Sequence, residues 1–322
     1  VDPYGGQKDL ADKVIRCVGD PNERFAEDAL RILRAMRFSS VYGFSIDQNT
    51  AKAIHSHKEK LQGISFERIR QELLKMITGD NILQVLLEYS DVIATIIPEI
   101  KPCIGFNQNN PYHIYNVYDH IAHAVANYKG KDIAVAMTLL LHDIGKPDCY
   151  TVDHKGGHFH GHGVRSRDIC IGVLDRLRFD NKTKHDILQL VLDHDSWIEP
   201  NRKTVCKWLN KLGEHQFLRL LDVRMADILA HAESTYGSRI ERCNQLREIF
   251  NQIVSENSCF KISDLAINGN DIMQMLHIPS GPAVGAILKD VLDLVVDGSL
   301  NNDRDSIEAY LLHNYIKYGK IE

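Results

Sequence analysis

The sequence lacks clustered cysteines and any long apolar run. Its seven cysteines are scattered singly with no CxxC pair, which is typical of free thiols in a reducing cytosol. A bilayer span needs about 20 apolar residues, and the most apolar run, Ile133–Leu141, is too short and ends in His142 and Asp143. We also expect no signal peptide. We therefore expect a cytoplasmic protein that does not enter a membrane.

An excess of positive charge is also missing. The net charge of −5 argues against a protein that binds nucleic acid through bulk positive charge, although a local basic face remains open. The share of hydrophobic residues, 44%, and of charged residues, 25%, is that of an ordinary globular protein. A chain of 322 residues is long enough for two or three small domains or one extended helical body.

Alternating, strand-like residues occur convincingly only at 14–17, and nearly every other segment has helical spacing. The sequence therefore predicts an all-α fold. Ser65 is expected to cap a helix, a candidate hairpin lies within 151–163, and the loop from Lys101 to Pro111 is expected to be a domain boundary. The other expected helices or helical regions cover 24–41, 116–128, 132–142, 162–178, 182–195, 203–258 and 262–318.

A single helix starting at Arg24 would place its residues on two faces, at about 100° per residue. The apolar face would face a core and holds Phe25, Ala29, Ile32, Leu33 and Met36. The opposite face holds Arg24, Glu27, Asp28, Arg31 and Arg34. It is either a solvated surface with i,i+3 and i,i+4 ion pairs or a base-reading element. In the second interpretation Asp28 accepts from a base amine, Arg31 donates, and Arg34 and Arg37 meet phosphates.

The residues around this helix carry a family resemblance. The runs Asp2-Pro3-Tyr4-Gly5-Gly6-Gln7-Lys8-Asp9-Leu10, Ile15-Arg16 and Asp20 through Phe38, followed by Gly43-Phe44 and Glu67-Arg68, resemble the class II tRNA nucleotidyltransferase and poly(A) polymerase family. The resemblance implies an elongated neck, body and tail. It also implies that Glu27, Asp28 and Arg31 select CTP and then ATP, that magnesium accompanies these nucleotides, and that tRNA is a partner.

The resemblance further implies a catalytic head with a Gly-Ser motif and paired carboxylates. Two-metal phosphoryl transfer needs such carboxylates, and no Asp-x-Asp in that context occurs after Val1. We therefore expect the head upstream, and a parent enzyme that adds CCA to tRNA 3′ ends while this chain alone does not polymerise. Addition of CCA, of A only, of CC only and of poly(A) all stay open, as does the oligomeric state.

A second group of residues begins at the end of an apolar helix. His142 and Asp143 follow Leu141 there, and such side chains are uncommon in an apolar setting unless they are paired or bind a metal. Each by itself is more often a satisfied polar residue. Imidazole with carboxylate suits Mn²⁺, Fe²⁺, Ni²⁺ or Mg²⁺ more than structural zinc. The other candidates in chain order are His120, His162, His194 and Asp227.

This order resembles the HD superfamily of metal-dependent phosphohydrolases, with Leu140-Leu141-His142-Asp143-Ile144-Gly145-Lys146 as the strongest match. The resemblance implies a primary metal site made of His120, His142, Asp143 and Asp227. His162 and His194 would hold a second ion, Lys146 would contact phosphate or act as an electrophile, and His158 and His160 would be loop or surface residues. The implied chemistry is water attack on a phosphodiester, as 2′,3′-cyclic phosphodiesterase, 2′-nucleotidase or phosphatase.

The predicted domains are the end of a palm at 1–22, a neck and body at 23–105, an HD domain at 106–258 and a tail at 259–322. In the tail, Pro282 is expected in the first turn of a helix. This turn is either a plain connection or a phosphate site, and the family resemblance favours a module that grips the tRNA elbow. Two other functions remain open, a free-standing HD phosphohydrolase and a non-catalytic RNA-binding body.

Overall fold

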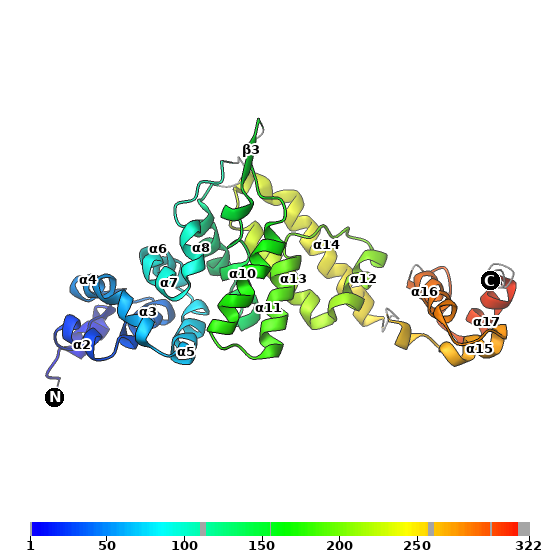
Figure 1. Ribbon diagram of the computed structural model, residues 1–322, viewed down its shortest axis with the longest axis horizontal. Coiled ribbons are helices and arrows are strands. Elements are labelled where there is room, and N and C mark those ends of the chain that lie inside the picture. The colour runs from blue at the N-terminus through cyan, green and yellow to red at the C-terminus, as the bar shows by residue number, and fades with distance from the viewer. Residues whose placement is uncertain (1, 110–113, 155, 257–260, 297, 315–322) are drawn as a thin grey trace. The chain divides into compact units, whose positions relative to one another are not determined.

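The computed structural model describes residues 2–109, 114–154, 156–256, 261–296 and 298–314. These residues form two compact units, one made of Val1–Ser196 with Arg219–Ile240 and the other of Trp197–Leu218 with Glu241–Glu322. Helices dominate both units, so the all-α prediction is confirmed (Figure 1). Parts of the sequence-based expectations lie outside the described residues, namely Asn110 and Pro111 of the expected boundary loop, residue 155 of the hairpin, and residues 257–260, 297 and 315–322 of the last helical regions and the tail.

The N-terminal part of the first unit is a group of short helices with one small parallel strand pair. Val14 pairs with Ser45 and Ile15 with Ile46, so the expected strand at 14–17 is only two residues long. Ser65 stands at the N-cap of α5 as predicted, although its side chain makes no capping hydrogen bond. The elements are α1 (Gly6–Ala11), β1 (Val14–Ile15), α2 (Pro21–Glu27), α3 (Leu30–Tyr42), β2 (Ser45–Ile46), α4 (Gln48–His57), α5 (Phe66–Ile77), α6 (Ile82–Glu88) and α7 (Ser90–Ile96), with 3-10 turns at Lys58–Gly63 and Pro98–Cys103.

The expected single helix over 24–41 was wrong, because the chain leaves the helical conformation between α2 and α3. Asp28 has φ −147° and ψ 101°, which is extended backbone. Its Oδ1 accepts a hydrogen bond from the Leu30 amide at 3.1 Å, so the side chain competes with helical continuation. The apolar face was predicted correctly, and all five of its members are buried, namely Phe25, Ala29, Ile32, Leu33 and Met36.

The rest of the first unit is a helical body built around α9 (Ile133–Leu141). Every residue from Ala134 to Leu141 is buried, as expected for a helix that is apolar all round. It packs against α8 (Val117–Asn127), α11 (Asn181–Asp193) and α5. The other elements are α10 (His162–Arg176), the C-terminal part of α13 (Glu214–Ile228), the first residues of α14 (Tyr236–Ser255), and 3-10 turns at Pro147–Cys149 and Glu233–Thr235.

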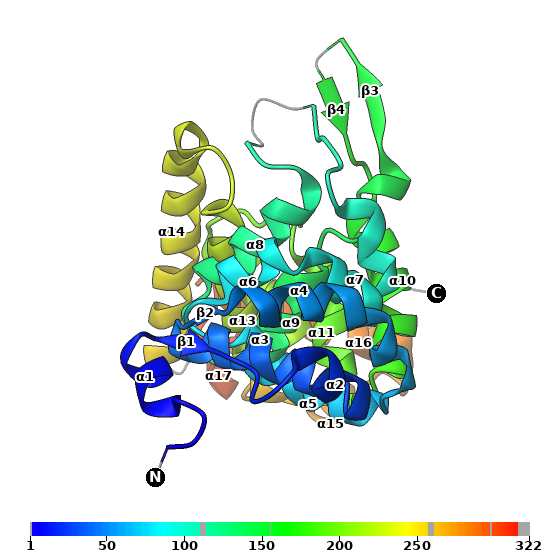
Figure 2. The same cartoon turned by 90° about the vertical axis from the view of Figure 1, so that its left-hand side faces the viewer.

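The candidate hairpin is present and projects from this body (Figures 1 and 2). Strands β3 (Thr151–Asp153) and β4 (Gly156–His158) pair in antiparallel fashion. The hairpin is held to the preceding loop, because the Gly157 amide donates to the Asn109 carbonyl at 2.9 Å. Its second strand leads directly into the N-terminus of α10.

The second unit contains α12 (Arg202–Leu212), most of α14, a 3-10 turn at Ile262–Asp264, α15 (Gly269–Leu276), α16 (Pro282–Val296) and α17 (Arg304–His313). Pro282 begins α16, as predicted. Among the described residues, no helix is both long and apolar enough to cross a membrane. The predicted domain boundaries at 22, 105 and 258 stay predictions.

Candidate metal centre and nucleotide cavity

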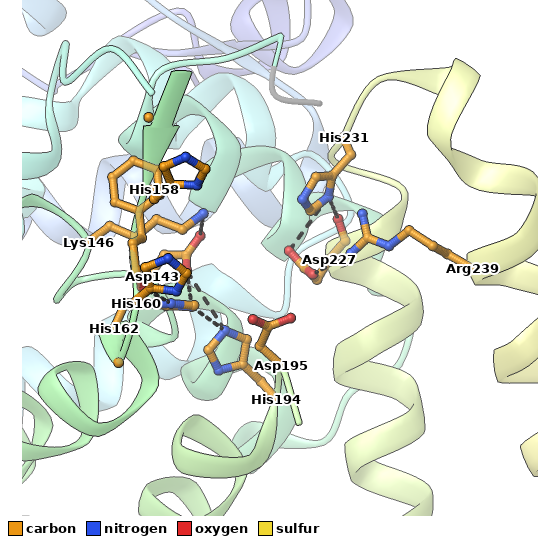
Figure 3. A pocket seen from close by; sticks show the side chains of 13 residues that line it. Asp143, Lys146, His158, His160, His162, His194, Asp195, Asp227, His231 and Arg239 are labelled. Carbon is orange, nitrogen blue, oxygen red and sulfur yellow. Dashed lines mark hydrogen bonds and ion pairs between the residues drawn. The ribbon is translucent and has the colours of Figure 1, made fainter. Parts of the chain in front are cut away.

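The structure brings all six predicted metal ligands together in the first unit. They come from five different helices or helix ends, and Figure 3 shows four of them facing one cavity. His120 lies in α8, His142 and Asp143 follow α9, His162 is the first residue of α10, His194 follows α11, and Asp227 lies near the end of α13.

Asp143 is the centre of this group, because its two oxygens face different histidines. Oδ2 lies 3.3 Å from His120 Nε2 and 3.2 Å from His142 Nε2. Oδ1 lies 3.4 Å from His162 Nε2 and 3.8 Å from His194 Nε2. Potential ligand atoms form three overlapping groups in the part of the chain that the structure describes: His120 with His142 and Asp143, Asp143 with His162 and His194, and His120 with Asp227 and His231. The primary and second metal sites stay predictions.

Asp227 belongs to the predicted primary site. Its Oδ1 lies 2.9 Å from His120 Nε2 and 3.5 Å from His142 Nε2. His120 and Asp227 are 107 residues apart in the chain. The all-round apolar surface of α9 explains how they meet, since burying it draws α8 and the helices after it around one point.

The tautomer of each imidazole follows from its backbone partner. In all four predicted ligand histidines Nδ1 faces a main-chain carbonyl, which can only accept a hydrogen bond, so Nδ1 carries the proton of the neutral ring. Nε2 of His120 and His142 faces the carboxylates of Asp143 and Asp227, and Nε2 of His162 and His194 faces Asp143, the usual arrangement of metal-ligating histidines. The carbonyls belong to Ala230 for His120 (3.2 Å), Leu139 for His142 (2.8 Å), Phe159 for His162 (2.9 Å) and Val191 for His194 (2.7 Å).

Several of these acceptors lack the donor that their burial demands. His162 Nε2 and His194 Nε2 lie 3.1 Å apart, a separation at which both can ligate one ion. His142 Nε2 and both carboxylate oxygens of Asp143 are buried without a hydrogen-bond partner among the described residues. Asp143 is ion-paired with Lys146, whose Nζ lies 2.7 Å from Oδ2, but its oxygens and His142 Nε2 keep lone pairs that a cation could occupy. The donor set therefore fits a divalent cation.

The pKa values of the cluster show the same need for positive charge. Burial by itself would lower the pKa of His142, but the Asp143 and Asp227 carboxylates raise it to about 10. Burial, together with charge on His142 and His162, lowers the pKa of His194 to about 3. Burial opposes ionisation of Asp143 and Asp227, yet the surrounding cationic groups hold the pKa of both well below the usual range. A bound metal would displace the proton from His142.

Lys146 is buried beside this cluster and is held by three groups. Its Nζ lies 2.7 Å from Asp143 Oδ2 and 5.3 Å from the centre of the Phe159 ring, and donates to Gln108 Oε1 at 3.0 Å. Gln108 in turn donates through Nε2 to the Tyr115 carbonyl at 3.1 Å. The amine therefore helps to keep Asp143 ionised. Gln108 was missed from sequence, because a lone glutamine in a loop has no diagnostic spacing.

The cluster opens into a cavity of about 290 Å³. Three residues on its wall were also missed from sequence: Asp195, His231 and Arg239. His231 follows Asp227 by one helical turn and donates through Nδ1 to its carbonyl at 2.8 Å, a spacing that was visible in the sequence. Arg239 Nη2 lies 3.6 Å from Asp227 Oδ2. The complete lining is Asp143, Lys146, Gly157, His158, Phe159, His160, Gly161, His162, His194, Asp195, Asp227, His231 and Arg239.

His158 and His160, expected as loop or surface residues, lie at the end of the hairpin. Both line the cavity, and their rings stack with centres 5.6 Å apart. His158 is also 2.9 Å from Asp153 Oδ1. Neither belongs to a group of potential metal ligands in the part of the chain that the structure describes. They therefore form the rim of the cavity.

The predicted nucleotide-reading residues do not all line the same cavity. Arg31 and Arg34 line a second cavity of about 410 Å³, together with two arginines that the prediction did not assign to the site, Arg16 and Arg24. Glu27 does not line the cavity but accepts hydrogen bonds from two of its arginines, Arg31 Nη1 at 2.9 Å and Arg24 Nη1 at 3.0 Å.

Asp28 and Arg37 lie away from this cavity. Asp28 Oδ2 accepts from Arg68 Nη2 at 3.0 Å, while Oδ1 caps α3. Arg37 Nη1 lies 2.9 Å from Glu72 Oε2, and its guanidinium stacks over the Phe38 ring. The cavity that the structure forms is therefore cationic and suited to phosphate.

Comparisons with known protein families give two matches. Residues 43–104 match the probable RNA and SrmB-binding site of polymerase A. Residues 172–311 match the putative domain 2 of tRNA nucleotidyltransferases.

Comparisons with curated proteins give relatives along nearly the whole chain. The CCA-adding enzyme of Geobacillus sp. (strain WCH70) is 26% identical over 330 residues, which cover 99% of this chain and 68% of that enzyme. The A-adding tRNA nucleotidyltransferase of Deinococcus radiodurans is 24% identical, with 95% of this chain and 72% of that protein covered.

Solved structures confirm the fold. The Bacillus stearothermophilus CCA-adding enzyme in complex with CTP has a TM-score of 0.65 at 23% identity and covers 99% of this chain, against 70% of its own. The Thermotoga maritima CCA-adding enzyme complexed with tRNA has a TM-score of 0.55 at 18% identity and covers 97% of this chain, against 67% of its own. Taken with the two family matches and the curated relatives, the resemblance to the tRNA nucleotidyltransferase and poly(A) polymerase family is confirmed.

Proposed function

We propose that this relative of the tRNA nucleotidyltransferases is part of an enzyme that adds CCA to tRNA 3′ ends and that it carries a second, hydrolytic site of HD type. CCA-adding relatives along nearly the full chain support the first part. The two family matches cover residues 43–104 and 172–311 and so extend well beyond the segment that holds the predicted ligands, which favours this function over a free-standing hydrolase. The arginine-lined cavity of about 410 Å³ would bind the phosphates of CTP or ATP with magnesium.

For the hydrolytic site, one observation carries the proposal. The Nε2 atoms of His162 and His194 lie 3.1 Å apart, and both face the same oxygen of Asp143, at 3.4 and 3.8 Å. One divalent ion ligated by these three atoms would satisfy all of them at once. His120, His142, Asp143 and Asp227 would hold one divalent ion, and Asp143, His162 and His194 a second.

A divalent ion in this setting supplies a nucleophile at neutral pH and neutralises phosphate charge. The residues of the chain would position the metal ligands and the substrate. Backbone carbonyls orient each imidazole, and Lys146 and the histidines keep Asp143 ionised. The cavity of about 290 Å³ is at the small end of the ligand-pocket range, roughly 300–1,000 Å³. It suits a phosphate with its ribose, so we infer 2′,3′-cyclic phosphates or phosphomonoesters at RNA ends as substrates.

The test is hydrolysis of a 2′,3′-cyclic nucleotide by the purified chain with Mn²⁺, Ni²⁺ or Mg²⁺, together with metal analysis after dialysis. Asp143→Ala should abolish both turnover and metal binding. Asp148→Ala is the matched control, since this carboxylate lies five residues on and pairs with Arg165 at the surface. Both activities should be retained in the control. Full metal content in the Asp143→Ala variant, or no turnover by the wild type with any ion, would contradict the hydrolytic assignment.

A further inference from the structure

The lining of the cavity of about 290 Å³ beside the candidate metal ligands includes one cationic side chain, that of Arg239, whose N–H donors make no hydrogen bond among the described residues. Arg239 reaches from the start of α14 toward Asp227, on the side of the cavity away from Lys146 (Figure 3). The distance from its Nη2 to Asp227 Oδ2, 3.6 Å, is too long for a hydrogen bond. Among the residues that the structure describes, no hydrogen bond holds this guanidinium. With its side chain 32% exposed, Arg239 presents its donors to the cavity.

The other cation of the cavity is already engaged. Lys146 is buried, and its amine is ion-paired with Asp143 and hydrogen-bonded to Gln108, so it is already engaged within the protein. The lining otherwise carries three carboxylates, on Asp143, Asp195 and Asp227. A phosphate entering such a site needs a positive group on the open side, in addition to any metal on the floor.

We propose that Arg239 binds the non-bridging oxygens of the substrate phosphoryl group, an assignment that rests on the proposed hydrolytic function. A guanidinium offers two parallel N–H donors in a fixed fork that matches two phosphate oxygens. The weak pairing with Asp227 keeps the side chain close to the ligands without using up these donors. Arg239 is therefore a substrate-binding residue that approaches from a segment supplying none of the predicted metal ligands.

The experiment measures binding of inorganic phosphate to the full chain loaded with Mn²⁺, by titration calorimetry. Arg239→Ala should weaken phosphate binding at least about tenfold, the expected loss of a charge-assisted hydrogen bond. Arg239→Lys should give an intermediate affinity, because a point charge replaces the fork. The matched control is Arg242→Ala, which removes the same charge three residues further along α14, where the guanidinium stacks on the Trp197 ring at 3.6 Å. This control should bind phosphate like the wild type.

Hydrolysis kinetics provide a second measurement. Arg239→Ala should raise KM for a phosphomonoester by a similar factor while its Mn²⁺ affinity stays at the wild-type value. Unchanged phosphate affinity in Arg239→Ala and Arg239→Lys would overturn the proposal. So would a parallel loss of Mn²⁺ and phosphate, which would show that Arg239 acts through Asp227. A wild type that binds phosphate through Arg239 but hydrolyses nothing would contradict the proposed function and leave this assignment standing.

Discussion

Replacing His194 by alanine separates the two proposed metal positions. The imidazole is buried, and its Nε2 lies 3.1 Å from His162 Nε2 and 3.8 Å from Asp143 Oδ1. Among the described residues, His194 groups as a potential ligand with Asp143 and His162, and not with His120 or Asp227. The variant should therefore keep the first ion and lose the second, so that the stoichiometry falls from two ions per chain to one.

The size of the effect follows from linkage. An ion present at 100 times its Kd stabilises the folded state by about 2.7 kcal/mol. Loss of a ligand that weakens this ion about 100-fold leaves about 0.4 kcal/mol, a difference of about 2.3 kcal/mol. For a unit of about 200 residues, 1 kcal/mol shifts Tm by roughly 2–4 °C, so the metal-induced rise in Tm should be smaller by about 5–9 °C.

The assay is thermal unfolding with and without Mn²⁺, with metal content measured on the same samples. His158→Ala is the matched control, because His158 lines the same cavity but belongs to neither ligand set. Its metal-induced rise in Tm should equal that of the wild type. Two retained ions in the His194→Ala variant would refute the two-site arrangement. An equal loss in both variants would show that the charge of the cavity, and not ligation, is responsible.

Three further predictions concern other parts of the first unit. In the arginine-lined cavity, Arg31→Ala should weaken CTP binding about tenfold by calorimetry while Arg167→Ala does not; equal effects would count against this cavity. Burial raises the pKa of Glu99, but two hydrogen bonds that it accepts from Arg176 outweigh burial and lower this pKa. The Glu99–Arg176 pair therefore stabilises the folded state above the unfolded pKa of Glu99, about 4.3, and this stabilisation is lost as pH falls through the lower folded pKa. Arg176→Ala should therefore lower the free energy of unfolding by about 1–2 kcal/mol at pH 7, measured by urea unfolding, and by progressively less below pH about 4. A difference between variant and wild type that does not change with pH would contradict this. Gly145→Ala places a Cβ 2.6 Å from the backbone nitrogen of Ser166 in α10 and should lower the free energy of unfolding by about 1–3 kcal/mol. A variant as stable in urea as the wild type would show that α10 shifts to make room for the methyl group.

Much of the site could be predicted from sequence, because its chemistry lies in residue types and order. His142 and Asp143 end a helix that is apolar all round, and two polar groups in that position need a partner whatever the fold. The other ligands lie at helix ends or on helices, where periodicity is readable. Residues without such a pattern, Gln108 and Arg239, were missed.

The sequence by itself determined the helical character of the chain, the identity of the candidate ligands and the apolar face that begins at Phe25, because local periodicity and residue chemistry carry this information. Only the tertiary structure decided which polar groups meet. Asp28 pairs with Arg68, 40 residues away, and its carboxylate accepts from the Leu30 amide at the start of α3 in place of lining the arginine-lined cavity. A projection that assumes an unbroken helix cannot show this, since the break depends on a side-chain hydrogen bond and the partner arrives from another helix.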